Sequence, residues 1–197
     1  MAYALYVSHP QVEMDPDIPV PQWSLSARGR ERAAGFAHAV LVKSLKRIVT
    51  SDETKARETA AILGEALGIE PEVIADMGEL DRSVPGYVPP DRFEELANLC
   101  FAKPNESAEG WERAIDAQGR IAKAVDTVLA DHDPTAPIAF VGHGGVGTLL
   151  KSHLAQRPIS RAGDQPLGGG NAYMVRLTDR LLLGDWMPFE RFAGYGG

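Results

Sequence analysis

Two histidines in this chain each stand at the end of a short apolar run, and this pairing constrains the fold more than any other feature of the sequence. The run 137–141 (PIAFV) leads into GHGG, which contains His143, and the run 2–7 (AYALYV) leads into SHP, which contains His9. Short apolar runs bounded by glycine or proline are typical of buried strands. Because open α/β sheets bind their ligands at the carboxyl ends of the strands, we expect His9 and His143 to share one pocket.

Apolar runs alternate with longer helical stretches along the chain. The predicted strands lie at 2–7, 47–50, 72–75 and 137–141, and the predicted helices at about 27–42, 54–67, 109–130 and 146–154. Two last runs, 172–177 and 181–186, predict an antiparallel hairpin. Strands that alternate with helices indicate βαβ units, so we expect a three-layer α/β/α fold around a mostly parallel central sheet.

Length and composition favour a single domain over 1–197. A chain of 197 residues that is 44% hydrophobic can bury one sizeable core. The formal net charge of −7 argues against general nucleic-acid binding, because phosphate backbones bind clustered lysine and arginine. No stretch approaches the roughly 20 apolar residues that cross a bilayer, and no basic flank precedes the first apolar run. Cys100 is the single cysteine, which fits a reducing compartment, so we expect a cytoplasmic protein.

Two long irregular segments interrupt this alternation. Segment 82–109 contains four prolines, and segment 157–170 contains two prolines and three successive glycines. Long connections within a compact domain are usually functional, so we expect both segments to help form a binding pocket.

Five short blocks of sequence follow one another in the order of a known enzyme family. They are SHP at 8–10, LSARGRERA at 25–33, SDETKARET at 51–59, MGE at 77–79 and GHGG at 142–145. Through these blocks the chain resembles the histidine phosphatase superfamily, the phosphoglycerate-mutase-like enzymes, over nearly its whole length. The resemblance implies the fold of that family, a cofactor-independent activity on phosphate esters, and a cap at about 82–109 inserted over the pocket.

The same resemblance implies roles for individual side chains. His9 would be the nucleophile that carries the phosphoryl group, with its ring oriented by a backbone carbonyl, and His143 would donate to the phosphoryl oxygens. Glu79 would give a proton to the leaving oxygen, and Asp81 is the alternative donor. Gly144, beside the second histidine, is expected to contact the substrate.

The blocks depart from the family pattern at its cationic positions. The arginine before the first histidine is Ser8, the glycine after it is Pro10, and the arginine of the third block is Lys55. Residues 11–15 (QVEMD) offer no counterpart to the asparagine and threonine that help to hold phosphate. Arginine binds two phosphoryl oxygens with a planar fork whereas lysine is one compact charge, so these changes remove directed hydrogen bonds.

Other side chains must then hold the phosphate. We expect Lys55 to supply part of the missing positive charge, and Ser8 to add one hydroxyl donor. The alternative is that Lys55 is a solvated lysine paired with Glu53 or Glu58. The further candidate cations are Arg28, Arg57 and Arg82. On a helix Arg57 would point about 200° away from Lys55, which makes it a poor direct replacement.

Two other kinds of site find little support in the sequence. Segment 142–147 (GHGGVG) matches the dinucleotide motif G-x-G-x-x-G, but Asp164, the acid at the required spacing, lies in a segment without strand character. His38, His132 and His153 have no close ligand spacing, and we expect them to be ordinary surface or packing residues. We therefore expect no metal and no cofactor.

Two hypotheses from different classes remain. In the first, the chain is a phosphatase that hydrolyses a small phosphomonoester through a phosphohistidine at His9. A phosphoglycerate-mutase-type phosphotransferase is a variant of it, less favoured because rebinding an acidic intermediate needs more cations. In the second, the chain is a catalytically impaired pseudophosphatase that binds phosphate or another ligand. The expected partner is a small phosphorylated molecule, with no nucleic acid and no membrane, and the chain is either a monomer or a homodimer.

Overall fold

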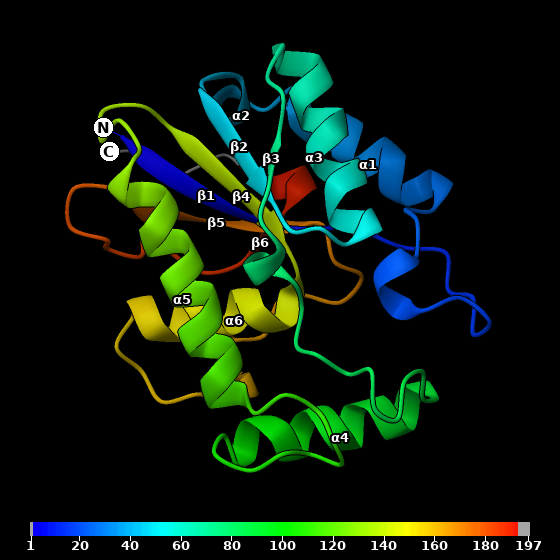
Figure 1. Ribbon diagram of the computed structural model, residues 1–197. Helices are drawn as coiled ribbons and strands as arrows, with labels where there is room; N and C mark the ends of the chain where they lie inside the picture. The colour runs from blue at the N-terminus through cyan, green and yellow to red at the C-terminus, as the bar shows by residue number, and fades with distance from the viewer. Residues whose placement is uncertain (1, 193–197) are drawn as a thin grey trace.

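A six-stranded sheet forms the centre of the protein in the computed structural model, which describes residues 2–192 (Figure 1). The strand order is β3-β2-β4-β1-β5-β6. The strands are β1 (Tyr3–Ser8), β2 (Arg47–Thr50), β3 (Glu72–Val73), β4 (Ile138–Gly142), β5 (Asn171–Arg176) and β6 (Met187–Pro188). The first four in this order run parallel, and β5 is antiparallel to both β1 and β6. The mostly parallel sheet predicted from the sequence is confirmed.

Helices cover both faces of this sheet. They are α1 (Ala27–Ala37), α2 (Val40–Lys43), α3 (Thr54–Leu67), α4 (Pro90–Ala102), α5 (Ala114–Ala130) and α6 (Gly144–Leu154), with short 3-10 turns at Val20–Gln22, Ala75–Met77, Arg161–Gly163 and Phe189–Arg191. Helices α1, α2 and α3 lie on one face, whereas α5 and α6 lie on the other (Figure 1). Helix α4 lies beyond the ends of α5 and α6 (Figure 1). The three-layer α/β/α prediction is therefore confirmed.

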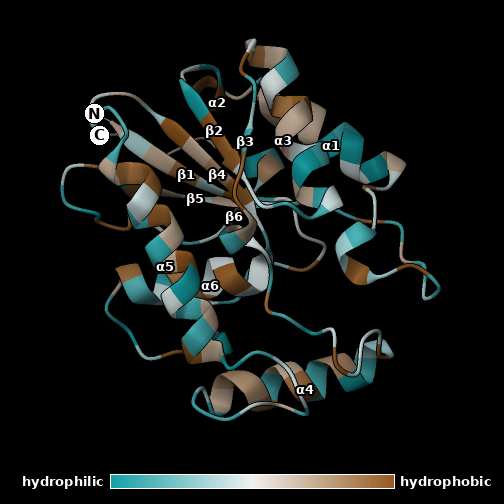
Figure 2. Cartoon of the chain, viewed as in Figure 1, coloured by the Kyte–Doolittle hydropathy of each residue, from teal (hydrophilic) through white to brown (hydrophobic). Residues whose placement is uncertain are grey.

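Strand β1 shows why both faces must be covered. Tyr3, Leu5 and Val7 belong to the core cluster under α1 and α3, whereas Ala4 and Tyr6 belong to the cluster under α5 and α6. Successive side chains of a strand point to opposite faces, so a strand that is apolar at every position is buried on both sides. In Figure 2, β4 and the part of β2 beyond its first residue have the brown colour of hydrophobic residues, as expected for strands buried on both faces.

Two predicted helices have different bounds in the structure. The helix expected at 27–42 ends at Ala37, the chain turns through His38 and Ala39, and α2 follows as a separate short helix. This break leaves Val40 on the surface and buries Val42 in the core. The helix expected at 109–130 starts only at Ala114. By contrast, β2 and α3 have the predicted bounds.

The segment predicted to be irregular, 82–109, contains helix α4. Pro89 and Pro90 stand at its first positions, where proline is tolerated because the first N–H groups of a helix have no partner within it. Leu96, Cys100 and Phe101 are buried on one side of α4, which packs into the core cluster with α5 and α6. The prediction was wrong for 90–102, because Pro89 and Pro90 mark the start of a helix, whereas the residues on either side of α4 are irregular as expected.

The second arm of the predicted hairpin, 181–186, is not a strand. It is joined to β5 through a single bridge between Leu182 and Val175, and the last strand, β6, begins at Met187. At the end of this arm, the indole ring of Trp186 packs edge-on against Tyr6 and Tyr173 in the core.

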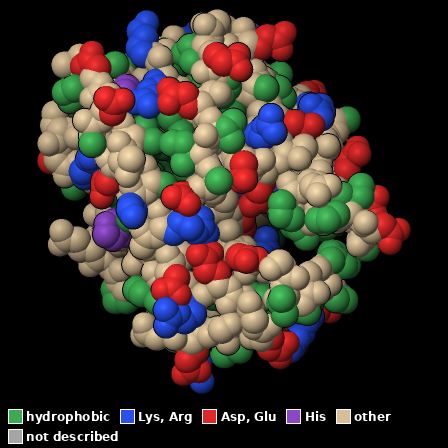
Figure 3. All heavy atoms as spheres, viewed as in Figure 1, with side chains coloured by type: hydrophobic (Ala, Val, Ile, Leu, Met, Phe, Trp, Pro, Cys, Tyr) green, Lys and Arg blue, Asp and Glu red, His purple; other side chains and the backbone are tan. Residues whose placement is uncertain are grey.

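The surface carries charges of both signs. Figure 3 shows acidic and basic side chains interspersed over one face, without a continuous basic patch. Among the helices of residues 2–192, none combines the length and the apolar character needed to cross a bilayer.

Candidate active site

The two histidines at the strand ends lie against each other. His9 follows β1 and His143 follows β4, and these strands pair in parallel up to Ser8 and Gly142. The ring centroids are 5.3 Å apart, with an angle of 68° between the ring planes. The parallel register thus brings together the pair that the sequence predicted.

The ring of His9 is held in one orientation. Its Nδ1 lies 2.8 Å from the carbonyl oxygen of Pro10, and its backbone N–H donates to the carbonyl of Gly142 at 2.9 Å. A carbonyl oxygen only accepts hydrogen bonds, so Nδ1 carries the proton and Nε2 presents its lone pair. Burial, together with His143 and Lys55, lowers the pKa of His9 to about 3. At neutral pH the ring is therefore uncharged and able to act as a nucleophile.

His143 is completely buried at the position preceding α6. Its Nε2 lies 2.7 Å from Ser51 Oγ and 3.4 Å from Glu53 Oε1. Within the described part of the chain, its Nδ1 has no hydrogen-bond partner. Burial lowers the pKa of His143, although Glu53 and Glu79 act in the opposite direction.

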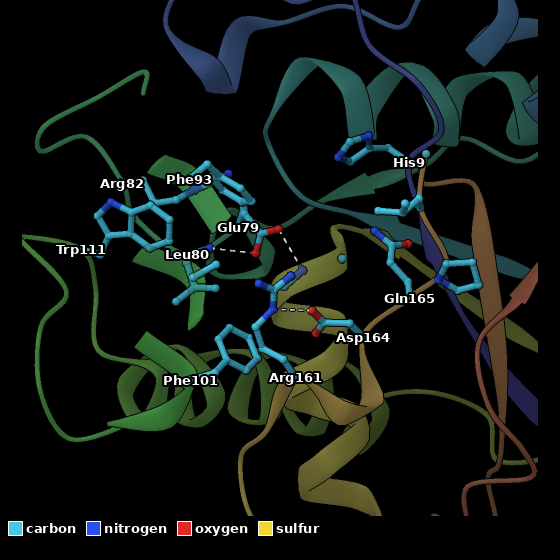
Figure 4. Close-up of a pocket in the computed structure, with 16 residues that line it drawn as sticks. His9, Glu79, Leu80, Arg82, Phe93, Phe101, Trp111, Arg161, Asp164 and Gln165 are labelled. Atoms are coloured by element: carbon cyan, nitrogen blue, oxygen red, sulfur yellow. Dashed lines mark hydrogen bonds and ion pairs between the residues drawn. The ribbon is translucent and has the colours of Figure 1, made fainter. Parts of the chain in front are cut away.

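Glu79 lies at the N-terminus of α6 as a carboxylate. Its oxygens accept hydrogen bonds from the backbone N–H groups of Leu80, Gly145 and Val146 at 3.0, 3.0 and 2.9 Å. Figure 4 shows the carboxylate between His9 and the wall formed by Arg82 and Phe93. Burial by itself would raise the pKa of Glu79, but His143 and the hydrogen-bonding amide of Leu80 lower it. The first backbone N–H groups of a helix have no partner within it, so an anion is favoured at this position.

A buried ion pair, Glu53 with Lys55, lies behind the histidines at the start of α3. The side chains are 10% and 4% exposed, and Lys55 also donates to the carbonyl of Val20 at 2.9 Å. Glu53 accepts a hydrogen bond from the N–H of Glu79 at 2.7 Å. Burial would raise the pKa of Glu53, but His143 and the Lys55 ammonium lower it to about 2. The pairing of Lys55 with Glu53 is therefore buried and not solvated.

Ser8 and Gly144 hold the loop 157–170 against the site. Ser8 is buried, its Oγ donates to the Gln165 side-chain oxygen, and it accepts from the N–H of Asn171 at 3.1 Å. A Cβ atom at Gly144 would lie 2.0 Å from Gln165 Nε2, so only glycine lets this amide approach the start of α6. The hydroxyl of Ser8 thus positions the loop.

An open cavity of about 230 Å³ lies between His9 and α4 (Figure 4). Its lining comes from the strand end at His9, the start of α6, the segment 79–111 and the loop 157–170. The lining residues are His9, Glu79, Leu80, Arg82, Phe93, Ala97, Phe101, Trp111, Gly144, Gly145, Arg161, Asp164, Gln165, Pro166, Leu167 and Gly168. Both irregular segments that the sequence singled out therefore form its walls.

Two arginines line this cavity, and they differ in whether they are paired with a carboxylate. Arg82 stacks on the rings of Phe93 and Trp111, with its guanidinium carbon 4.9 and 5.4 Å from the centroids. It forms no ion pair with any carboxylate in residues 2–192. Arg161 is bound at 2.6 Å to Asp164, whose pKa is raised by burial, and also to a glutamate of α4. Of the two cations, Arg82 is the one left available to an anionic ligand.

The structure does not bring every candidate residue to the cavity. Arg28 is exposed on α1, and Arg57 is exposed on α3, where it lines a separate hollow with Glu58. Asp81 is exposed and accepts from the N–H of Ser83 at 2.8 Å, also outside the cavity. Ser8, Lys55 and His143 lie behind the cavity wall, although they are close to His9 or Glu79.

Sequence reasoning did not place Ser51, Glu53, Asp164 or Gln165 at the histidine site, although it named Glu53 as a possible partner of Lys55 and Asp164 as the acid of a dinucleotide motif. Ser51 and Glu53 belong to the block 51–59, and their position in this block was the available signal. Asp164 and Gln165 lie in the loop 157–170, whose length was the only signal for them. Their contacts with the site depend on how the loop folds back over α6.

The glycine-rich segment 142–147 does not leave its helix N-terminus free for a pyrophosphate. The N–H groups of Gly145 and Val146 already donate to the Glu79 carboxylate, which an incoming diphosphate would have to displace. Residues 2–192 also contain no group of three histidine, cysteine or acidic side chains arranged to hold a metal ion.

Comparison with known proteins identifies similar chains. The family model described as histidine phosphatase superfamily (branch 1) matches residues 10–180. Glucosyl-3-phosphoglycerate phosphatase of Mycobacterium tuberculosis is 27% identical over 190 residues, covering 85% of this chain and 78% of that protein. Among solved structures, the mycobacterial glucosyl-3-phosphoglycerate phosphatase has a TM-score of 0.77 at 20% identity, covering 95% of this chain and 99% of that chain. Bacillus stearothermophilus YhfR has a TM-score of 0.75 at 18% identity, covering 92% and 94%.

Proposed function

This chain belongs to the histidine phosphatase superfamily, and from this premise we propose that it hydrolyses a small phosphomonoester through a phosphohistidine at His9. The observation that carries the proposal is the orientation of His9, whose Nδ1 is bound to the Pro10 carbonyl. This bond leaves the Nε2 lone pair free in an uncharged ring. Membership of the family and the mycobacterial relative support phosphatase activity as such.

The reaction has two steps. In the first, His9 Nε2 attacks phosphorus, the bond from phosphorus to the ester oxygen breaks, and that oxygen takes a proton from Glu79. In the second, water attacks the phosphohistidine and gives its proton to the Glu79 carboxylate. Nε2 then recovers its lone pair, and inorganic phosphate leaves. The Ser51 hydroxyl donates to His143 Nε2 at 2.7 Å in the neutral tautomer that carries its proton on Nδ1. This Nδ1–H, which has no partner within residues 2–192, belongs to a ring packed against His9 and supplies a donor to the phosphoryl group.

Glu79 must hold a proton to act as the acid, although three backbone N–H groups favour its carboxylate form. A bound phosphate ester places a second negative charge beside it. Like charges disfavour ionisation, so the pKa of Glu79 rises when the ester binds. Substrate binding and proton uptake by Glu79 are thereby coupled.

The leaving group occupies the cavity beyond His9. Phe93 and Trp111 form an apolar wall there, and Arg82 lies over both rings without a carboxylate partner. We infer that Arg82 contacts an anionic oxygen of the substrate, which compensates in part for Ser8 and Lys55 at the family's arginine positions.

The test is hydrolysis of a chromogenic phosphomonoester by the wild-type protein and by His9→Ala. We expect the substitution to reduce turnover by about 10³-fold or more, because the covalent step disappears. Rapid quenching of the wild-type reaction with a ³²P-labelled ester should trap acid-labile label on the protein, and His9→Ala should trap none. Turnover that survives in His9→Ala would remove His9 from this role.

The second candidate is a pseudophosphatase that binds a ligand without turnover. The observation in its favour is the Glu53–Lys55 pair, since a carboxylate neutralises the lysine that stands at the family's arginine position. The two candidates differ in one measurement. A pseudophosphatase would bind phosphate or vanadate between the histidines without hydrolysing any ester of a broad panel of phosphorylated metabolites.

A further inference from the structure

The inner end of the site, behind the cavity, is filled by the side chain of Glu53. Its Oε2 is bound to the Lys55 ammonium, and its Oε1 accepts from the N–H of Glu79 at 2.7 Å. The same Oε1 lies 3.4 Å from His143 Nε2. One carboxylate thus contacts a cation, a backbone N–H and a catalytic imidazole at once.

Of these three groups, the Lys55 ammonium is the one that we expect to bind a phosphoryl group. A carboxylate and a phosphoryl group accept hydrogen bonds from the same donors, and both prefer charged ones. Lys55 is the cation at the family's arginine position, and the Glu53 carboxylate together with the Val20 carbonyl already occupies its ammonium. Glu53 therefore stands in the structure as an anion already bound in the site.

We propose that Glu53 is a specificity-determining residue, a built-in anion that withholds Lys55 from free phosphate and yields only to a substrate that also binds the cavity wall. The inference rests on the proposed function and adds to it a condition on the substrate. Glu53 must leave Lys55 before a phosphoryl oxygen can take its place.

The free energy for this displacement has to come from contacts away from the phosphoryl group. Inorganic phosphate offers only its own charges, which the carboxylates of Glu53 and Glu79 repel. An ester also contacts Arg82 and the rings of Phe93 and Trp111, and such remote binding energy can drive rearrangement at the reacting centre. The expected substrate is therefore a phosphomonoester with a leaving group large enough to reach this wall. The expected product, inorganic phosphate, is a weak inhibitor.

The test compares the binding of vanadate and inorganic phosphate to the wild-type protein, Glu53→Gln and Asp52→Asn by calorimetry. Glutamine keeps the size of Glu53 and removes its charge, and Asp52 is an adjacent, exposed carboxylate. Structures of mycobacterial glucosyl-3-phosphoglycerate phosphatase with inorganic phosphate and with VO3 make these anions suitable probes. We expect Glu53→Gln to bind both anions at least tenfold more tightly, and Asp52→Asn to bind them within twofold of the wild type.

A second comparison separates this role from a merely structural one. If Glu53 acts by withholding Lys55, then Lys55→Met in the Glu53→Gln background should remove most of the gain in affinity. A structural partner of Lys55 would instead alter the melting temperature of the free protein and leave the phosphate-dependent rise in melting temperature unchanged. Equal or weaker anion binding by Glu53→Gln would overturn the proposal, as would a gain that persists without Lys55.

The two proposals fail in different measurements. Absence of turnover in every variant, with tighter anion binding by Glu53→Gln, would refute the phosphatase and leave the role of Glu53 intact. Turnover that depends on His9, with unchanged anion affinity in Glu53→Gln, would support the phosphatase and refute the role of Glu53.

Discussion

The inner cluster of Ser51, Glu53, Lys55 and His143 differs from the outer wall of the cavity, although both carry charge beside His9. The inner charges are buried and satisfy one another, with Lys55 4% and Glu53 10% exposed. On the outer wall, Arg82 is partly exposed and stacked on aromatic rings, without a carboxylate partner within residues 2–192. Charge in the inner cluster is thus tied to the stability of the fold, whereas charge on the outer wall is available to a ligand.

Lys55→Met should have the largest effect on stability. It leaves the Glu53 carboxylate buried without its cation, and breaking a buried pair in this way costs about 3–5 kcal/mol of unfolding free energy. Phosphate binding should weaken as well, whereas Lys55→Arg should preserve it. Urea unfolding and phosphate titration measure both effects. The double variant Glu53→Gln/Lys55→Met, which removes both charges, should recover much of the lost stability; a double variant as unstable as Lys55→Met would refute the pairing.

Acidification should destabilise the protein through the carboxylate of Glu53. The pKa of Glu53 is about 2 in the folded protein, against an ordinary value of 4.5. Between these values the unfolded chain binds the extra proton, so stability falls as the pH falls through this window, by up to about 3 kcal/mol. His9, with a folded pKa of about 3, contributes an earlier loss that starts below pH 6.5. The unfolding free energy of Glu53→Gln should therefore depend less on pH than that of the wild type, and only below about pH 4.5. Chemical denaturation at a series of pH values measures this difference.

Arg82→Met should leave stability nearly unchanged and impair catalysis. The loss of the stacked guanidinium costs about 0.5–1 kcal/mol. The loss of its contact with the substrate should raise KM for an anionic ester about tenfold, with a smaller change in kcat. Steady-state kinetics beside Arg28→Met, an exposed arginine outside the cavity, provide the control. An unchanged KM in Arg82→Met would mean that the outer wall does not bind the anion.

Much of the fold could be predicted from local sequence because its central elements are defined by periodicity. Strand β2 and helix α3 have the predicted bounds, and the two apolar runs before His9 and His143 are buried strands of one sheet, as predicted. Helix α4 was not predicted because its prolines stand at its first turn, where they start a helix. The packing of Trp186 at the end of the arm 181–186 was not predicted either, because it is a contact with residues far away in the sequence.

The sequence by itself determined the family, the α/β/α layers and the proximity of His9 to His143. The histidines meet because strands of a parallel sheet have their carboxyl ends at the same edge. Only the tertiary structure decided what surrounds this pair. Whether Lys55 faces solvent, a ligand or Glu53, and whether Arg82 or Arg57 reaches the cavity, depends on side chains from segments far apart in the chain. Burial and charge pairing between these segments fix the state of each group, and no local pattern of residues encodes them.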